Sequence, residues 1–239
     1  MTSSPLPPPP SLRERAIVLV HGAWVGEWSW SPVVDRLRAS DRPVHNVSLT
    51  GQGARRHQAS AAITLADHVA DVIGVFDTFD LTDVTLVGHS YGGRVITAAA
   101  PHVAGRLAAM VYLDAHAPSA PDAGQSPERI AMAEAHGGLL PFVGYDHDVE
   151  QLPTDEARRW FLERTVAHPF QTFTVDWQRP VPDGVRPTYV FATESPGTRF
   201  GGYADGARRD PAWRYLELPG PHFLMLSHPD EVTDIILTA

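Results

Sequence analysis

The chain has 239 residues, of which 43% are hydrophobic and 20% are charged, and its formal net charge is −9. This length is enough for a single domain with a full core and one insertion. An acidic chain without a basic run is a poor candidate for binding nucleic acid or an anionic membrane, so neither is expected as a partner.

Cysteine and lysine are both absent from the sequence, and all 19 basic residues are arginine. The chain therefore offers no disulfide, no thiolate zinc site and no cysteine nucleophile. It also lacks the lysine that Schiff-base chemistry and the P-loop require. We expect a site that works without a metal or a cofactor.

The beginning of the chain, MTSSPLPPPPSLRER, is rich in proline. Residues 1–11 are expected to form a disordered, extended tail. This stretch lacks the basic segment followed by an apolar segment that is typical of a signal peptide, and no apolar run approaches the ~20 residues of a membrane span. These features predict a cytoplasmic protein.

Apolar runs that are typical of buried strands alternate with segments of helical spacing along most of the chain. Strands are predicted over 16–22, 43–49, 84–88, 108–115, 187–195 and 213–220, and helices over 29–39, 64–79, 91–104 and 227–237. In the last helix, Ser227 and Asp230 resemble a capping box. Such alternation predicts an α/β fold with a mainly parallel six-stranded sheet covered by helices on both faces.

The alternation is interrupted by a segment that is rich in proline and aromatic residues. We interpret residues 117–186 as a small helical cap inserted into a core formed by 12–116 and 187–239. The aromatic residues of this cap predict a pocket for an apolar or aryl acyl group. The residues expected to line it are Trp24, Phe142, Trp160 and Phe161.

A serine stands in the tight corner between the strand 84–88 and the helix that follows it, in the sequence LVGHSYGG. The pattern G-x-S-x-G in a strand–turn–helix context is a nucleophile elbow, in which a strained turn exposes the serine hydroxyl. Small residues are needed around such a turn, and Gly88, Gly92 and Gly93 supply them. The sequence therefore predicts Ser90 as a nucleophile.

A serine hydroxyl needs a general base, and on this architecture the chain order is serine, acid, histidine. His222 in LPGPHFLML follows the last predicted strand and precedes the closing helix, so it is the expected base. An oxyanion hole needs two backbone N–H donors. Tyr91, directly after the nucleophile, and Ala23, in the HGAW loop after the first strand, are the expected donors.

Four segments resemble the α/β-hydrolase superfamily, within it the branch of plant methylesterases, hydroxynitrile lyases and their bacterial esterase relatives. They are LVHGAWVGEWSW, LVGHSYGG, VYLDAHAP and LPGPHFLMLSHPDEV, spread from residue 19 to residue 232. The resemblance implies an α/β-hydrolase fold, with Ser90 as nucleophile, His222 as base, and Ala23 and Tyr91 as oxyanion donors.

Two carboxylates are candidates for the acid of the triad. In the plant branch the acid follows the strand predicted here over 187–195, where this sequence reads Thr193-Glu194-Ser195. Some relatives place the acid one strand earlier, which corresponds here to Asp114. A charge at the end of a buried strand is costly unless it is paired, which favours Asp114 over Glu194.

The expected function is hydrolysis of a small to medium apolar carboxylic ester or lactone through an acyl-enzyme. An acyltransferase and a catalytically weak ligand-binding protein on the same fold are the alternatives. Hydroxynitrile lyases use a lysine shortly after the catalytic histidine, and this chain has Phe223-Leu224-Met225 there and no lysine at all. Lyase activity is therefore not expected.

Overall fold

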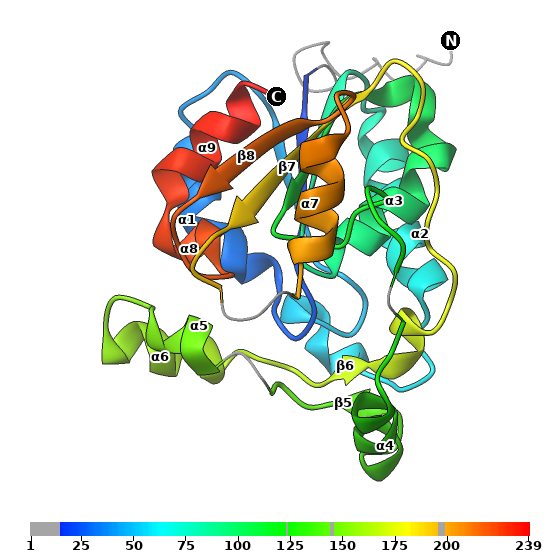
Figure 1. Cartoon of the computed structure of the whole chain (residues 1–239), viewed down its shortest axis with the longest axis vertical. Helices are drawn as coiled ribbons and strands as arrows, with labels where there is room; N and C mark the ends of the chain where they lie inside the picture. The colour runs from blue at the N-terminus through cyan, green and yellow to red at the C-terminus, as the bar shows by residue number, and fades with distance from the viewer. Residues whose placement is uncertain (1–14, 123, 144–145, 196–198) are drawn as a thin grey trace, which may run out of the picture.

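The computed structural model describes residues 15–122, 124–143, 146–195 and 199–239. The tail predicted over 1–11 lies outside these residues. Six parallel strands form one central sheet, in the order β2-β1-β3-β4-β7-β8 (Figure 1). They are β1 (Ile17–Val20), β2 (Val44–Val47), β3 (Val84–His89), β4 (Leu107–Leu113), β7 (Arg186–Ala192) and β8 (Arg214–Leu218). The six predicted strands are thus all present, and the predicted α/β class is confirmed.

The central strands are buried on both faces, which is why they consist of continuous apolar runs. Every residue of β1 and of β3 is buried. In the parallel register, Gly88 of β3 lies between Val20 of β1 and Tyr112 of β4. The loops that follow these three strands therefore leave the sheet side by side, at its carboxyl edge.

Helices cover both faces of the sheet (Figure 1). On one face lie α1 (Ser31–Leu37) and α9 (Pro229–Leu237), which pack against each other, and on the other lie α2 (Leu65–Phe79), α3 (Gly92–Val103) and α7 (Gly201–Arg209). The helix α7 was not predicted, because the sequence GGYADGARR has three glycines and buries only Tyr203, Ala204 and Ala207. The 3-10 helix η3 (Gly53–Gln58) lies between β2 and α2.

The closing helix differs from its prediction at the amino end. It is split into α8 (Leu224–Ser227) and α9, with His228 in a non-helical conformation between them. Proline has no N–H to donate, so Pro229 begins a new helix. The predicted capping box is wrong: the Ser227 side chain does not cap α9, and Asp230 forms an ion pair with Arg36 of α1.

The chain between β4 and β7 forms a layer across the carboxyl ends of the strands (Figure 1). Its elements are α4 (Pro127–Ala135), β5 (Leu139–Leu140), α5 (Asp146–Glu150), α6 (Asp155–Leu162), β6 (His168–Pro169) and the 3-10 helix η5 (Phe170–Phe173). The strands β5 and β6 pair in antiparallel fashion. We call this layer the cap. Two further 3-10 helices, η2 (Glu27–Trp30) and η4 (Ala104–Arg106), lie outside it.

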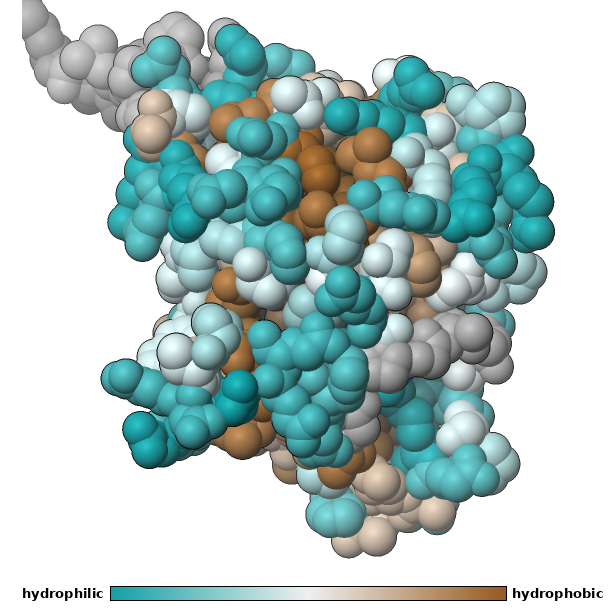
Figure 2. All heavy atoms as spheres, turned by 60° about the vertical axis from the view of Figure 1, so that its left-hand side comes forward, coloured by the Kyte–Doolittle hydropathy of each residue, from teal (hydrophilic) through white to brown (hydrophobic). Residues whose placement is uncertain are grey.

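On the face shown in Figure 2, hydrophobic residues reach the surface in separate patches that hydrophilic residues border. Among the described residues, no helix is both long and apolar enough to cross a membrane.

Candidate active site

Ser90 occupies a strained turn between β3 and α3. Its φ of 54° lies in the left-handed region, which an L-residue with a side chain rarely adopts. The turn is possible because its neighbours are small: a Cβ on Gly93 would lie 2.0 Å from the carbonyl oxygen of His116, and one on Gly88 would lie 2.7 Å from that of Gly92. The backbone oxygen of Ser90 accepts hydrogen bonds from the N–H groups of Gly93 and His116, both at 3.1 Å.

The imidazole of His222 pairs with Asp114 behind the elbow. The Nδ1–Oδ2 distance is 2.7 Å, and both side chains are buried. The ring of Phe200 stacks on the His222 ring at 5.0 Å with an angle of 6° between the planes. The His89 ring lies 4.5 Å away and its Nε2 contacts the carbonyl oxygen of His222 at 3.0 Å. Three side chains, those of Asp114, Phe200 and His89, thus hold the histidine in one orientation.

Asp114 follows β4 with a φ of 40°, a second strained position in the site. Its Oδ1 accepts a hydrogen bond from the N–H of Ala192 at 3.3 Å. Burial raises the pKa of the Asp114 carboxyl and lowers the pKa of the His222 imidazole, because a charge is less stable out of water. The other acid candidate, Glu194, is exposed in the turn after β7. The structure therefore brings Asp114, and not Glu194, to the histidine.

The two expected oxyanion donors, Ala23 and Tyr91, lie at the same pocket as Ser90. Within the described part of the chain, neither amide N–H makes a hydrogen bond. Trp24 has a φ of 64°, so the loop after β1 is also strained. A Cβ on Gly22 would lie 3.0 Å from the Cβ of Ser90, so glycine allows this loop to approach the elbow.

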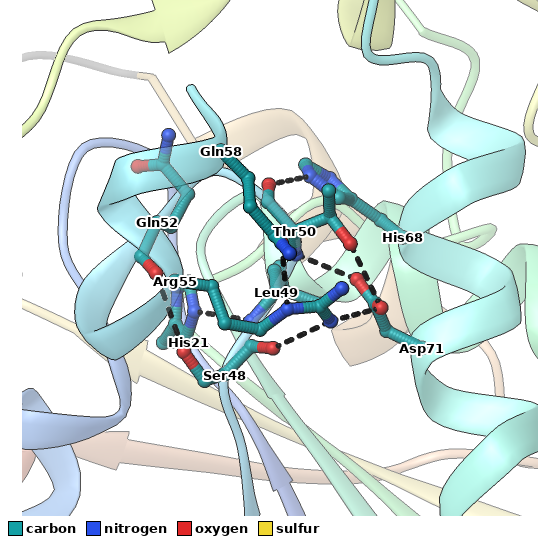
Figure 3. A network of polar contacts seen from close by, with 9 residues as sticks. All are labelled: His21, Ser48, Leu49, Thr50, Gln52, Arg55, Gln58, His68 and Asp71. Carbon is teal, nitrogen blue, oxygen red and sulfur yellow. Dashed lines mark hydrogen bonds and ion pairs between the residues drawn. The ribbon is translucent and has the colours of Figure 1, made fainter. Parts of the chain in front are cut away.

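A polar network that includes Thr50, His68 and Asp71 (Figure 3) continues through His68 to the hydroxyl of Tyr91. The Tyr91 hydroxyl contacts Nδ1 of His68 at 2.9 Å, and Nε2 of His68 contacts the carbonyl oxygen of Thr50 at 3.0 Å. The amide and hydroxyl of Thr50 donate to Asp71, which also pairs with Arg55. The network ties α2 to the elbow and fixes the residue whose N–H is the expected oxyanion donor.

The pocket beside Ser90 has a volume of about 320 Å³, which suits a small ligand. Of the four residues predicted to line it, Trp24 does so. Phe142, Trp160 and Phe161 are not among the described residues that line this pocket, so a role for them in substrate binding stays a prediction. The amphipathic helix α6 packs Phe161 against Trp28 and Phe223, and Trp160 against Trp28, because these rings are the apolar partners nearest to it.

Phe173, Phe200 and Tyr203 form the aromatic wall of the pocket instead. Polar side chains share the lining, among them Asp122, Gln125, Arg129 and Arg199. The pocket thus combines aromatic and polar lining residues. Arg94 of α3 is buried and pairs with Asp122 at 2.7 Å.

Asp148 and Phe200 are site residues that the sequence did not indicate. Oδ1 of Asp148, on α5 of the cap, accepts a hydrogen bond of 2.9 Å from the backbone N–H of His222. Neither residue belongs to a motif, and each reaches the histidine only through the fold. Among the described residues, no group of three His, Cys, Asp or Glu side chains is arranged to hold a metal ion.

The buried histidines make the fold sensitive to acid. Burial, which is partial for His45 and His116, lowers the pKa of seven histidines below the ordinary value of 6.5: His21, His45, His68, His89, His116, His168 and His222. As the pH falls through 6.5, the unfolded chain binds protons that the folded chain does not, so a depressed folded pKa means stability that is lost on acidification. For His21, whose pKa burial lowers to about 4, the loss between pH 7 and pH 5 is roughly 2 kcal/mol.

We therefore expect the free energy of unfolding, measured with urea, to fall steeply between pH 7 and pH 5. The slope should exceed about 1.4 kcal/mol per pH unit, which is the contribution of one histidine. If the midpoint urea concentration of unfolding did not change between pH 7 and pH 5, the histidines would not be buried in their neutral form.

Comparison with known proteins agrees with this architecture. The model of the alpha/beta hydrolase family matches residues 17–235. A carbendazim hydrolyzing esterase from Nocardioides sp. (strain SG-4G) is 30% identical over 242 residues, which cover 91% of this chain and 96% of that protein. A putative methylesterase 15 from Arabidopsis thaliana is 31% identical over 102 residues, which cover 42% of this chain and 23% of the plant protein.

Among solved structures, an extracellular alpha/beta-hydrolase from a Paenibacillus species has the same fold. The TM-score is 0.77 at 21% identity, over 94% of this chain and 98% of the other. The resemblance seen in the sequence is confirmed, and the chain belongs to the alpha/beta hydrolase family, in the branch of the plant methylesterases and their bacterial esterase relatives.

Proposed function

We propose that this protein is a serine hydrolase that cleaves small to medium carboxylic esters or lactones through an acyl-enzyme. The observation that carries the proposal is the arrangement around Ser90. Ser90, in its strained turn, lines a pocket together with Ala23 and Tyr91, whose amide N–H groups make no hydrogen bond among the described residues, and Asp114 and His222 form a buried pair. The names of the relatives, a carbendazim hydrolyzing esterase and methylesterases, support ester hydrolysis.

In the proposed reaction, Nε2 of His222 takes the proton of the Ser90 hydroxyl as its oxygen attacks the carbonyl carbon. The N–H groups of Ala23 and Tyr91 stabilise the negative charge that develops on the carbonyl oxygen. Asp114 holds the imidazole in the tautomer with hydrogen on Nδ1 and stabilises the imidazolium. The imidazolium then protonates the leaving alcohol, and a water molecule, activated by His222, hydrolyses the acyl-enzyme.

The polar network below Tyr91 contributes to this mechanism by preorganisation. An oxyanion donor is effective when it does not need to move as charge develops. Tyr91 is fixed at its hydroxyl by His68 and at its backbone by the turn into α3. Trp24, directly after the second donor, is fixed by a hydrogen bond of 2.9 Å from its Nε1 to the carbonyl oxygen of Leu140 in the cap.

The test of the acyl-enzyme is the release of p-nitrophenol from short-chain p-nitrophenyl esters in a stopped-flow instrument. Formation of an acyl-enzyme faster than its hydrolysis gives a burst equal to the enzyme concentration, followed by a slower steady state. We expect that burst. If p-nitrophenol were released neither in a burst nor in the steady state, the proposal would be contradicted. That result would favour a ligand-binding protein on the hydrolase fold. Acyl transfer to an added alcohol in preference to water would identify an acyltransferase.

A further inference from the structure

The pocket beside Ser90 contains more positive charge than binding a neutral ester requires. Arg129 of α4 and Arg199 of the loop after β7 both line it. Asp122 is the single carboxylate among the described lining residues. The net charge of the lining therefore depends on which positively charged side chain Asp122 pairs with.

Asp122 is fully engaged by groups other than these two arginines. Its Oδ2 contacts Nη2 of Arg94 at 2.7 Å and accepts a hydrogen bond from Nε1 of Trp177 at 2.9 Å. Its Oδ1 accepts one from the hydroxyl of Tyr203 at 3.0 Å. The carboxylate thus balances the charge of the buried Arg94, and the pocket lining carries two further guanidinium groups, those of Arg129 and Arg199.

The guanidinium of Arg129 is placed beside the pocket wall. Its central carbon lies 4.7 Å from the centre of the Phe173 ring and 5.7 Å from that of the Trp24 ring. Stacking on these rings directs the planar group along the wall. Gln125, in the same part of the lining, has a buried side-chain Oε1 without a hydrogen-bond partner among the described residues. A rotated amide there presents an N–H donor to a ligand.

The pKa of His116 is also affected by the arginines of the pocket. Burial is the main cause that lowers the pKa of His116, and the charges of Arg94, Arg129 and Arg199 lower it further. His116 also lines the pocket, so the positive potential extends through it. An anion entering this pocket meets attraction from two guanidinium groups.

We propose that the pocket selects esters that carry a second, anionic group, a carboxylate, and that Arg129 is the residue that binds it. The inference rests on the proposed function, since it concerns the substrate of the same serine. The substrate class is a half-ester of a dicarboxylic acid. Arg129 pairs with the free carboxylate while the ester carbonyl lies between Ser90 and the two oxyanion donors.

The test compares two series of methyl esters that differ in one group. Monomethyl succinate, glutarate and adipate carry a carboxylate, and the corresponding methyl amic esters carry a neutral carboxamide of the same shape. We expect kcat/KM to favour the carboxylate at least about tenfold at the best chain length, as one charge-assisted hydrogen-bonded pair provides. The preference should weaken with added salt.

Three variants separate charge from structure. Arg129→Gln should lower the carboxylate-to-carboxamide ratio about tenfold, and Arg129→Lys, which keeps the charge, should retain most of the preference. Arg158→Gln is the control: this arginine is also on the cap, pairs with Asp155 on α6 and is outside the pocket lining, so the ratio should not change.

The outcomes distinguish this inference from the function on which it rests. Ser90-dependent hydrolysis of the carboxamide esters with no preference for the carboxylate, or a preference that Arg129→Gln leaves unchanged, overturns the inference and leaves the esterase standing. Absence of Ser90-dependent hydrolysis for both series and for p-nitrophenyl esters overturns the proposed function and this inference together.

Discussion

Replacing Ser90 by alanine is expected to lower kcat/KM for p-nitrophenyl butyrate by about 10⁴-fold or more. The loss is this large because the proposed reaction forms a bond to the serine oxygen, and no neighbouring side chain replaces that atom. Alanine has nearly the same volume and adopts the strained turn as serine does, so the pocket and the Asp114–His222 pair remain. The measurement is steady-state hydrolysis together with the amplitude of the p-nitrophenol burst.

The matched control for this variant is Ser40→Ala. Ser40 follows α1, at the end of the sheet away from the site, and its hydroxyl donates to the carbonyl oxygen of Leu37 and accepts from the N–H of Arg42. Its burst and kcat/KM should equal those of the wild type. If Ser90→Ala turned over at a rate within a few-fold of the wild type, the elbow serine would not be the nucleophile, and the proposed mechanism would be wrong.

Replacing Asp114 by asparagine is expected to lower kcat by about 10⁴-fold. The asparagine oxygen can still accept from the N–H of Ala192, but its amide no longer stabilises the imidazolium and favours the wrong tautomer of His222. Glu194→Gln is the matched comparison, since Glu194 is exposed and the structure does not place it at the histidine. We expect its kcat to stay close to the wild-type value.

The stability of the Asp114→Asn protein separates a catalytic effect from a folding effect. Burial already raises the pKa of this carboxyl, which means that the folded chain disfavours its charge. A neutral isostere should therefore fold as well as aspartate does, and urea unfolding measures this directly. The assignment of the acid would be reversed if Glu194→Gln lost orders of magnitude and Asp114→Asn did not.

Local features of the sequence were sufficient to predict the strands of the sheet, the nucleophile elbow and the position of the base in the chain. The central strands β1, β3 and β4 are mostly apolar because they are covered on both faces, and the elbow glycines stand where a Cβ would contact backbone. Ser90 and the two expected donors follow strands whose carboxyl ends meet at one edge, so their proximity follows from the order of elements. The base His222 follows from the same order, since it lies after the last strand.

Long-range packing decided what the sequence left open. Asp114 and Glu194 both follow neighbouring strands, and which carboxylate meets the imidazole depends on where the turns direct each side chain. The aromatic residues of the cap illustrate the same limit. An aromatic residue such as Phe161 has no local signal that distinguishes a pocket wall from a packing contact. In the fold, α6 directs Phe161 into the interior, where its ring packs against Phe223.

The sequence by itself determined the fold class, the nucleophile elbow and the histidine that follows the last strand, because these depend on apolar periodicity, on small residues in one turn and on chain order. Only the tertiary structure decided that Asp114 pairs with His222, that Asp148 reaches the same histidine from the cap, and that Arg129 faces the pocket. These contacts join residues 74 to 108 positions apart or arise from the docking of the cap, and no local pattern encodes the distance between such residues.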